Sequence, residues 1–137
     1  MSDTLRFPLI QMDQQVGDAS ALPMLPFTLA YQQKSIQVMG LLDTGATVNV
    51  LPYNIGIVLG ATWEAEAVNL QLTGNLARYP AQPLFLDVLV GSFRPTELVF
   101  AWTRAETAPL LLGHVNFFAK FDVCLFRSQG FFELTLR

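Results

Sequence analysis

Short apolar runs separated by turn-forming residues dominate the chain. Runs of strand length occupy residues 23–31, 35–42, 47–51, 67–72, 77–79, 84–90, 97–102, 110–113, 121–126 and 131–136. Glycine, asparagine or proline stands near many of the boundaries, and these residues favour turns through their backbone freedom or rigidity. Long stretches of helical periodicity are missing from the sequence. The pattern therefore predicts an all-β fold.

Helical spacing is confined to two short segments. Val115, Phe118 and Ala119 recur at the spacing of a helix within residues 114–120, which predicts one short helix near the C-terminus. Residues 54–59 predict a single helical turn before Gly60.

The length and composition indicate one domain with an unusual amount of apolar surface. A chain of 137 residues fits one domain of ordinary size, so we expect a single domain over residues 1–137. The stretch 11–21 is polar, and we expect residues 1–22 to be partly flexible. Apolar residues make up 52% of the chain and charged residues only 14%. This excess indicates that a partner chain covers some apolar surface.

Several functional classes are disfavoured by what the sequence lacks. No apolar stretch approaches the roughly 20 residues that span a bilayer, and the N-terminus lacks the basic start and apolar segment of a signal peptide. The eight basic residues are scattered, and one histidine without a Cys-x-x-Cys pair offers too few metal ligands. We therefore expect a cytoplasmic protein with no membrane, nucleic-acid, metal or cofactor partner. Cys124 is the only cysteine, and we expect it to be buried.

The segment with the clearest chemistry is Leu41-Leu42-Asp43-Thr44-Gly45-Ala46. The leucine pair is typical of the end of a buried strand, and Gly45 favours a tight turn directly after it. This arrangement presents the Asp43 carboxylate at the edge of a hydrophobic scaffold, where an acid is a candidate for catalysis. The ordinary alternative is that Asp43 caps a turn through contacts with its own backbone. Leu111-Leu112-Gly113 repeats the pattern of an apolar pair before a tight turn.

The two segments together resemble the retropepsin-like aspartic proteases, the single-domain relatives of pepsin. The resemblance rests on apolar-apolar-Asp-Thr-Gly-Ala followed later by apolar-apolar-Gly, and it covers roughly residues 26–123 in order and spacing. It implies a closed β-barrel of the double-ψ type that works as a homodimer. It further implies that Asp43 is the catalytic residue, and that Leu111, Leu112 and Gly113 form a structural crossing loop.

The resemblance also implies supporting roles around Asp43. Thr44, Gly45 and Ala46 are implied to support the active-site loop, and a hairpin at residues 73–75 is implied to form a flap over the substrate. The residues implied to contact the substrate are Gly45, Thr47, Thr73, Gly74 and Asn75. Viral members often carry aspartate where this chain has Thr47, and their flaps are longer and richer in glycine. We therefore expect a shorter or stiffer flap.

One Asp-Thr-Gly motif predicts half of an active site. Peptide hydrolysis needs a general base and a general acid, and two carboxylates about 3 Å apart supply both roles by sharing one proton. The chain holds no second such motif, so a second copy is expected to contribute the other Asp43. The sequence thus predicts a homodimeric aspartic endopeptidase that cleaves extended, largely apolar peptide or protein segments.

Two arrangements are open for the chain ends. Residues 5–10 and 131–136 are apolar enough to interleave with a second copy, as the resemblance implies. The alternative is that they pair with each other within one chain.

Two other functions also stay open. A catalytically inactive module with the retropepsin fold would serve for dimerisation or peptide binding, and Thr47 and the altered flap favour it. The intact Asp-Thr-Gly opposes it, because a dimer that only binds gains nothing from bringing two carboxylates together. The remaining possibility is that Asp-Thr-Gly occurs by coincidence in an unrelated β-barrel.

Overall fold

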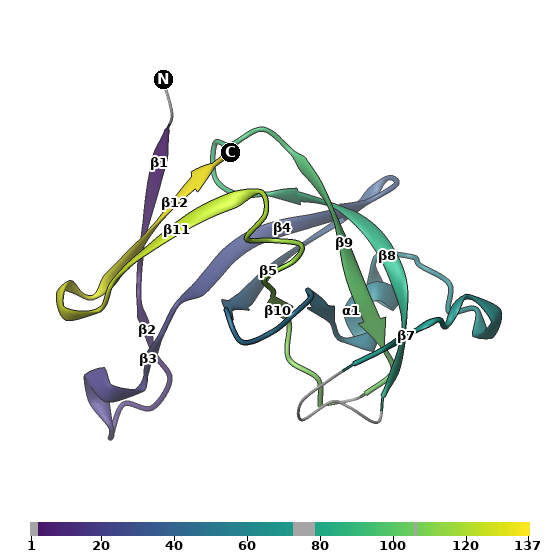
Figure 1. Ribbon diagram of the computed structural model, residues 1–137, viewed down its shortest axis with the longest axis horizontal. Coiled ribbons are helices and arrows are strands. Elements are labelled where there is room, and N and C mark those ends of the chain that lie inside the picture. Colours follow the sequence, from purple (N-terminus) through teal and green to yellow (C-terminus); the bar gives the residue numbers. More distant parts are fainter. Residues whose placement is uncertain (1–2, 73–78, 106) are drawn as a thin grey trace.

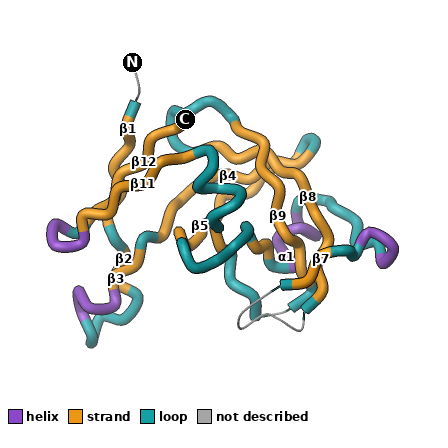
Figure 2. The backbone as a smooth tube through the Cα atoms, viewed as in Figure 1, coloured by secondary structure: helices purple, strands orange, loops and turns teal. Residues whose placement is uncertain are grey.

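Strands make up most of the regular structure (Figures 1 and 2). The computed structural model describes residues 3–72, 79–105 and 107–137. The strands are β1 (Thr4–Pro8), β2 (Ile10–Gln11), β3 (Ala21–Leu22), β4 (Met24–Tyr31), β5 (Lys34–Leu42), β6 (Val50–Leu51), β7 (Leu70–Gln71), β8 (Pro80–Leu89), β9 (Thr96–Thr103), β10 (Leu111–Leu112), β11 (Phe121–Phe126) and β12 (Phe131–Leu136). Short 3-10 turns lie at Gly17–Ser20, Ala65–Ala67 and Arg127–Gln129. The predicted all-β class is confirmed.

The α-helix does not lie where the sequence analysis placed it. Residues 114–120 form consecutive turns. The N–H groups of Phe117 and Phe118 both donate to the Gly113 carbonyl, at 3.0 and 3.3 Å, and those of Lys120 and Phe121 both donate to the Phe117 carbonyl, at 3.0 Å each. Two carbonyls therefore take all four bonds, and the regular ladder of a helix does not form.

The helix of the described residues is α1 (Tyr53–Val58), in the segment for which the sequence indicated a single turn. No helix in the described parts of the chain is long and apolar enough to cross a membrane.

Six strands close into a barrel. They are neighbours in the order β4, β5, β10, β6, β9 and β8, and β8 returns to β4 through the antiparallel pairs Thr28↔Leu89, Leu29↔Val88 and Ala30↔Asp87. The short strand β7 pairs with the start of β8, as expected for a hairpin between the two segments. Closure leaves the ring without a free edge. The predicted closed barrel is confirmed.

Large apolar side chains fill the barrel. Leu25 and Leu29 of β4 and Phe100 and Trp102 of β9 are fully buried. The Trp102 ring stacks on Tyr53 of α1, with ring centroids 5.6 Å apart, and its Nε1 donates to the Tyr53 carbonyl oxygen at 3.1 Å. This pair of contacts holds α1 against β9.

A second sheet of three antiparallel strands, β1–β12–β11, lies beside the barrel (Figure 1). Phe7 of β1 stacks on Phe132 of β12 with centroids 5.4 Å apart, and Arg6 forms an ion pair with Glu133 at 2.8 Å. Leu5 packs on the turn after β8 so closely that a Cβ at Gly91 would lie 2.6 Å from its Cδ1. The terminal strands therefore pair within one chain, which is the second of the two arrangements considered from the sequence.

The single cysteine is exposed, contrary to the sequence expectation. Side chains alternate along β11, and the inner positions are taken by the buried Phe121 and the half-buried Val123. Cys124 consequently shares the outer face with Asp122.

The contact between α1 and Trp102 gives a stability test. A Cβ at Gly56 would lie 2.3–2.6 Å from three atoms of the Trp102 indole. Alanine normally stabilises a helix relative to glycine, but here Gly56→Ala must displace the buried ring. We expect a loss of about 1–3 kcal/mol, measured by urea unfolding. The control is Asn54→Ala at an exposed position of the same helix. Equal stability of the two variants would contradict the packing argument.

Candidate active site

Asp43 follows β5 directly and begins a tight turn. Its backbone N–H donates to the Leu112 carbonyl at 3.0 Å, and its own carbonyl accepts from the Ala46 N–H at 3.1 Å. Its carboxylate Oδ1 accepts from the Gly45 N–H at 2.9 Å. The turn contact considered as the ordinary alternative is therefore present. Within the described residues the hydrogen bonds to this half-buried carboxylate reach Oδ1, and Oδ2 has no partner there.

Gly45 acts in this turn through its lack of a side chain, not through the backbone freedom inferred from the sequence. Its φ lies outside the left-handed region, so the backbone conformation of this turn does not itself require glycine. A Cβ at this position would lie 3.2 Å from Asp43 Oδ1, closer than most Cβ contacts. The absent side chain therefore leaves the carboxylate uncrowded.

The neighbouring loop residues form a second layer of backbone contacts. The Ala46 carbonyl accepts from the His114 N–H and the Thr47 carbonyl accepts from the Val115 N–H, both at 2.8 Å. Ala46 is half-buried, whereas the Thr44 and Thr47 residues are exposed. These bonds bring the loop after Asp43 and the loop after β10 side by side. Thr73, Gly74 and Asn75, expected to form the flap, lie outside the described residues.

Residues 111–113 lie across the loop that carries Asp43. β10 runs parallel to β5, with Leu111 opposite Leu41 and Leu112 opposite Leu42, and antiparallel to β6 on its other side. Gly113 follows at the point where the backbone of Val48 passes over it. A Cβ at Gly113 would lie 2.3 Å from the Val48 carbonyl oxygen. Only glycine fits such an approach of two backbones.

The side chain of Asn49 stabilises this crossing by hydrogen bonds. The sequence did not lead us to expect a role for this residue. Its side chain is fully buried. Its Oδ1 accepts from the Gly113 N–H at 2.8 Å, and its Nδ2 donates to the Val99 carbonyl at 3.2 Å. Its own N–H donates to Asn116 Oδ1 at 2.7 Å. The available signal was a lone amide within the apolar run Val48-Asn49-Val50-Leu51, where an unpaired polar group would be costly.

The surface next to Asp43 is apolar. Leu41 and Leu111 are direct neighbours and both are half-buried, whereas Leu42 and Leu112 one position further are buried in the core. Leu111 also packs, with Val48, on a small cluster that includes Ala105 and Ala108. Leu41, two residues before Asp43, and its neighbour Leu111 thus leave part of their apolar surface open near the turn that carries the carboxylate. The described residues contain no group of three or more His, Cys, Asp or Glu side chains placed to hold a metal ion.

Comparison with known proteins supports the fold. No family model matches the chain, and no curated protein matches it in sequence. Among solved structures, the crystal structure of a retropepsin-like aspartic protease from Rickettsia conorii is similar to it, with a TM-score of 0.58 over 99% of this chain and 94% of that chain. The sequence identity is 15%, so the likeness establishes the fold alone. The chain has a retropepsin-like fold, which confirms the resemblance seen in the sequence and excludes an unrelated β-barrel.

The buried amide predicts a large stability effect. Asn49→Ala removes the side-chain partner of the buried Gly113 N–H and of the part-buried Val99 carbonyl. We expect a loss of about 2–4 kcal/mol in the free energy of unfolding, measured by urea unfolding. Asn69→Ala changes an exposed asparagine and serves as the control. If the two variants unfold at the same urea concentration, Asn49 does not secure the crossing.

Proposed function

We propose that this chain is one half of an aspartic endopeptidase, in which two copies bring their Asp43 carboxylates together. The proposal is carried by the position of Asp43, which leaves β5 where residues 111–113 cross, within a retropepsin-like fold. Gly45 restrains Oδ1 of the carboxylate, while Oδ2 is left for chemistry. The chain has a single Asp-Thr-Gly, so the second carboxylate must come from a second copy.

Two Asp43 carboxylates provide a base and an acid in one site. Two carboxyl groups about 3 Å apart cannot both be ionised, because their negative charges repel, so the pair holds one proton. The ionised carboxylate takes a proton from a water molecule, whose oxygen attacks the peptide carbonyl carbon, while the protonated carboxylate gives its proton to the carbonyl oxygen. Collapse of the resulting diol breaks the C–N bond as the protonated carboxyl group gives its proton to the amide nitrogen and the ionised one takes a proton from a diol hydroxyl. The products are a carboxylic acid and an amine, and the pair again holds one proton.

The floor of the site indicates the kind of substrate. Leu41 and Leu111 offer partly exposed apolar surface close in the fold to the turn that carries Asp43. An extended peptide suits such a floor, because its alternate side chains reach one face and its backbone groups stay free for hydrogen bonds. The resemblance gives Gly45 and Thr47 contacts to the substrate backbone, and Thr73, Gly74 and Asn75 the role of a flap. We propose extended, largely apolar peptide segments as substrates.

Cleavage should depend on the Asp43 carboxylate itself. Asp43→Asn keeps a side-chain oxygen for the Gly45 N–H, so the turn and the fold are expected to survive. The amide cannot serve as the base, and cleavage of a mixed, denatured peptide pool should fall at least about a hundredfold. Mass spectrometry of the products measures the loss.

The control for this variant is Asp87→Asn, at an exposed position of β8. It should cleave as fast as the unaltered chain. Undiminished cleavage by Asp43→Asn would refute the assignment of the carboxylate. A verified dimer of the unaltered chain that cleaves nothing at any pH would instead favour the inactive binding module.

The proton shared by the two Asp43 carboxylates should make activity depend on pH and not on metal ions. Activity should be highest at acid to mildly acid pH and fall on both sides, because the working pair holds one shared proton. Chelators should leave the rate unchanged, since both catalytic groups are carboxylates. A rate that climbs steadily into the alkaline range, or that disappears with a chelator, would be inconsistent with this chemistry.

A further inference from the structure

Residues 10–22 form a short arm that exposes large apolar side chains. The arm consists of β2, β3 and the loop between them, and it carries Met12, Val16 and Leu22, which are 54%, 55% and 38% exposed. Its ladder contains only the pairs Ile10↔Leu22 and Gln11↔Ala21. So short a hairpin is not stable by itself in water. Its shape must therefore be fixed from elsewhere.

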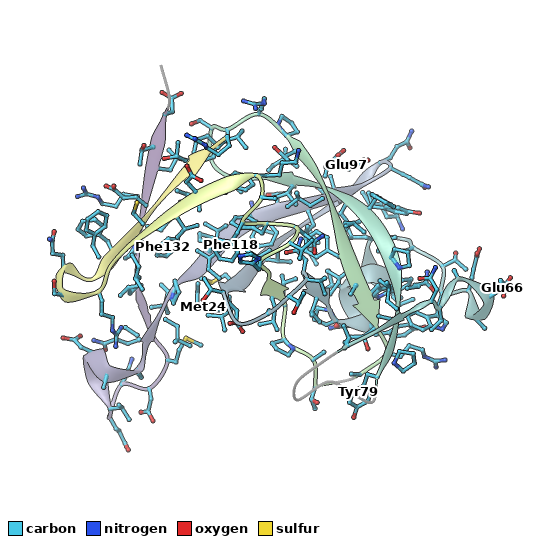
Figure 3. All side chains as sticks on the ribbon, in the orientation of Figure 1. Met24, Glu66, Tyr79, Glu97, Phe118 and Phe132 are labelled. Atoms are coloured by element: carbon cyan, nitrogen blue, oxygen red, sulfur yellow. The ribbon has the colours of Figure 1, made fainter. Side chains whose placement is uncertain are left out.

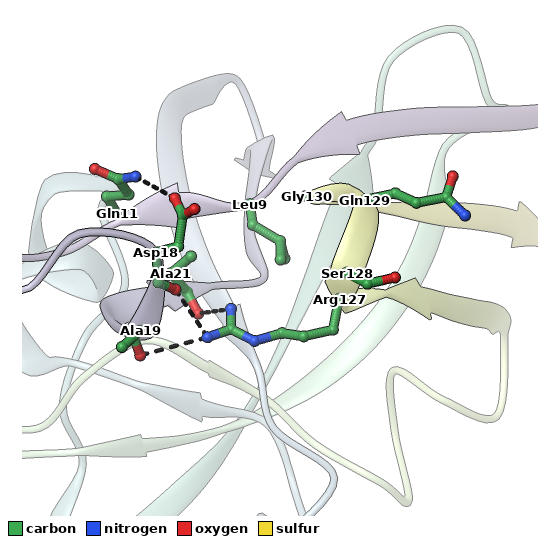
Figure 4. Close-up of a pocket in the computed structure, with 9 residues that line it drawn as sticks. All are labelled: Leu9, Gln11, Asp18, Ala19, Ala21, Arg127, Ser128, Gln129 and Gly130. Atoms are coloured by element: carbon green, nitrogen blue, oxygen red, sulfur yellow. Dashed lines mark hydrogen bonds between the residues drawn. The ribbon is translucent and has the colours of Figure 1, made fainter.

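Arg127 fixes the arm. Its guanidinium donates to the carbonyl of Ala21 at 2.7 Å, of Asp18 at 2.9 Å and of Ala19 at 3.4 Å (Figure 4). Within the arm, Gln11 Nε2 donates to Asp18 Oδ1 at 2.6 Å. The turn between β11 and β12 thus holds the arm in one orientation, although its apolar side chains face solvent. Such order lowers the entropy that would be lost on binding a partner.

The arm joins the barrel next to the candidate catalytic residue. The Pro23 carbonyl, directly after the arm, accepts from the Leu42 N–H at 3.1 Å, and Asp43 follows Leu42. Figure 1 shows the arm projecting from the barrel on the side of the β1–β12–β11 sheet. In Figure 3, Met24 and Phe132 mark this side of the molecule, whereas Glu66 lies at the opposite end.

We propose that the arm packs on a second copy of this chain and helps to assemble the active site. The inference rests on the proposed function, because a dimer that joins two Asp43 residues places its two-fold axis beside them. An arm that joins the barrel beside that axis lies at the interface between the two copies. Val115, which is 55% exposed, donates its N–H to the Thr47 carbonyl of the active-site loop, and Met39, which is 45% exposed, lies on β5 four residues before Asp43. Both offer apolar surface for the partner's arm.

Two-fold symmetry doubles the effect of a substitution in the arm on the free energy of dimerisation. Each contact of the arm occurs twice in the dimer, so a change that weakens one contact about tenfold weakens the dimer about a hundredfold. Val16→Lys places a charge at the tip of the arm, and Phe85→Lys is a matched control on the outer face of β8. The two side chains are 55% and 58% exposed, and both variants add one positive charge.

The dimer dissociation constant is measured by sedimentation over a range of concentrations, with peptide cleavage followed on the same samples. We expect Val16→Lys to raise the dissociation constant about a hundredfold and Phe85→Lys to change it less than threefold. Cleavage by Val16→Lys should recover at high protein concentration. Equal dissociation constants for the two variants would overturn the role of the arm, while a dimer that still cleaves peptides would leave the proposed function intact.

A second measurement does not depend on how well the lysine variants fold. In a Cys124→Ser background, Val16→Cys and Phe85→Cys each carry one exposed thiol whose reaction with a maleimide is timed. The Val16→Cys thiol should react more slowly as the protein is concentrated into dimers, and the Phe85→Cys thiol should not. Equal rates at every concentration, or a chain that stays monomeric throughout, would overturn the proposal.

Discussion

The passage of the Val48 backbone over Gly113 is the constraint on which the rest of the site depends. There is no room for a Cβ between the two backbones. Because the approach is so close, the polar groups around it must be satisfied internally, and the buried Asn49 does this for both Gly113 and Val99. The crossing in turn sets β10 between β5 and β6. A loop that would otherwise be free is thereby tied to the barrel wall immediately beside Asp43.

The position of the carboxylate follows from this crossing. The Leu112 carbonyl holds the backbone of Asp43, and the Gly45 N–H holds one of its carboxylate oxygens. The turn contact and a catalytic role are therefore compatible, because they use different oxygens. Gly45 serves the carboxylate through the absence of a side chain and not through an unusual φ. A restrained, uncrowded acid beside the apolar pair Leu41 and Leu111 is the arrangement from which we argue for peptide hydrolysis.

The sequence predicted what depends on local pattern and missed what depends on distant contacts. Alternation and turn residues located β11 and β12 correctly, and the apolar pairs before Asp43 and Gly113 located the two segments that meet. The helix expected at residues 114–120 does not form, because the carbonyls of Gly113 and Phe117 each accept two hydrogen bonds. This arrangement lets the rings of Phe117 and Phe121 stack within the core. Asn49 was missed because its partners, Val99 and Gly113, are fifty and sixty-four residues away. The lone amide within an apolar run marks the position of Asn49, but no local pattern identifies its distant partners.

Because β1 pairs with β12 within one chain, the terminal sheet can fold without a second copy. Chains whose terminal strands interleave cannot complete that sheet alone, so their folding and dimerisation are linked. Here both strands find partners within one chain, and the Phe7–Phe132 stack and the Arg6–Glu133 pair are made without a second copy. In the dimer we propose, association would therefore depend on surface such as the arm and the flanks of Asp43. A folded monomer would hold half a site, and its activity would follow the concentration of the chain.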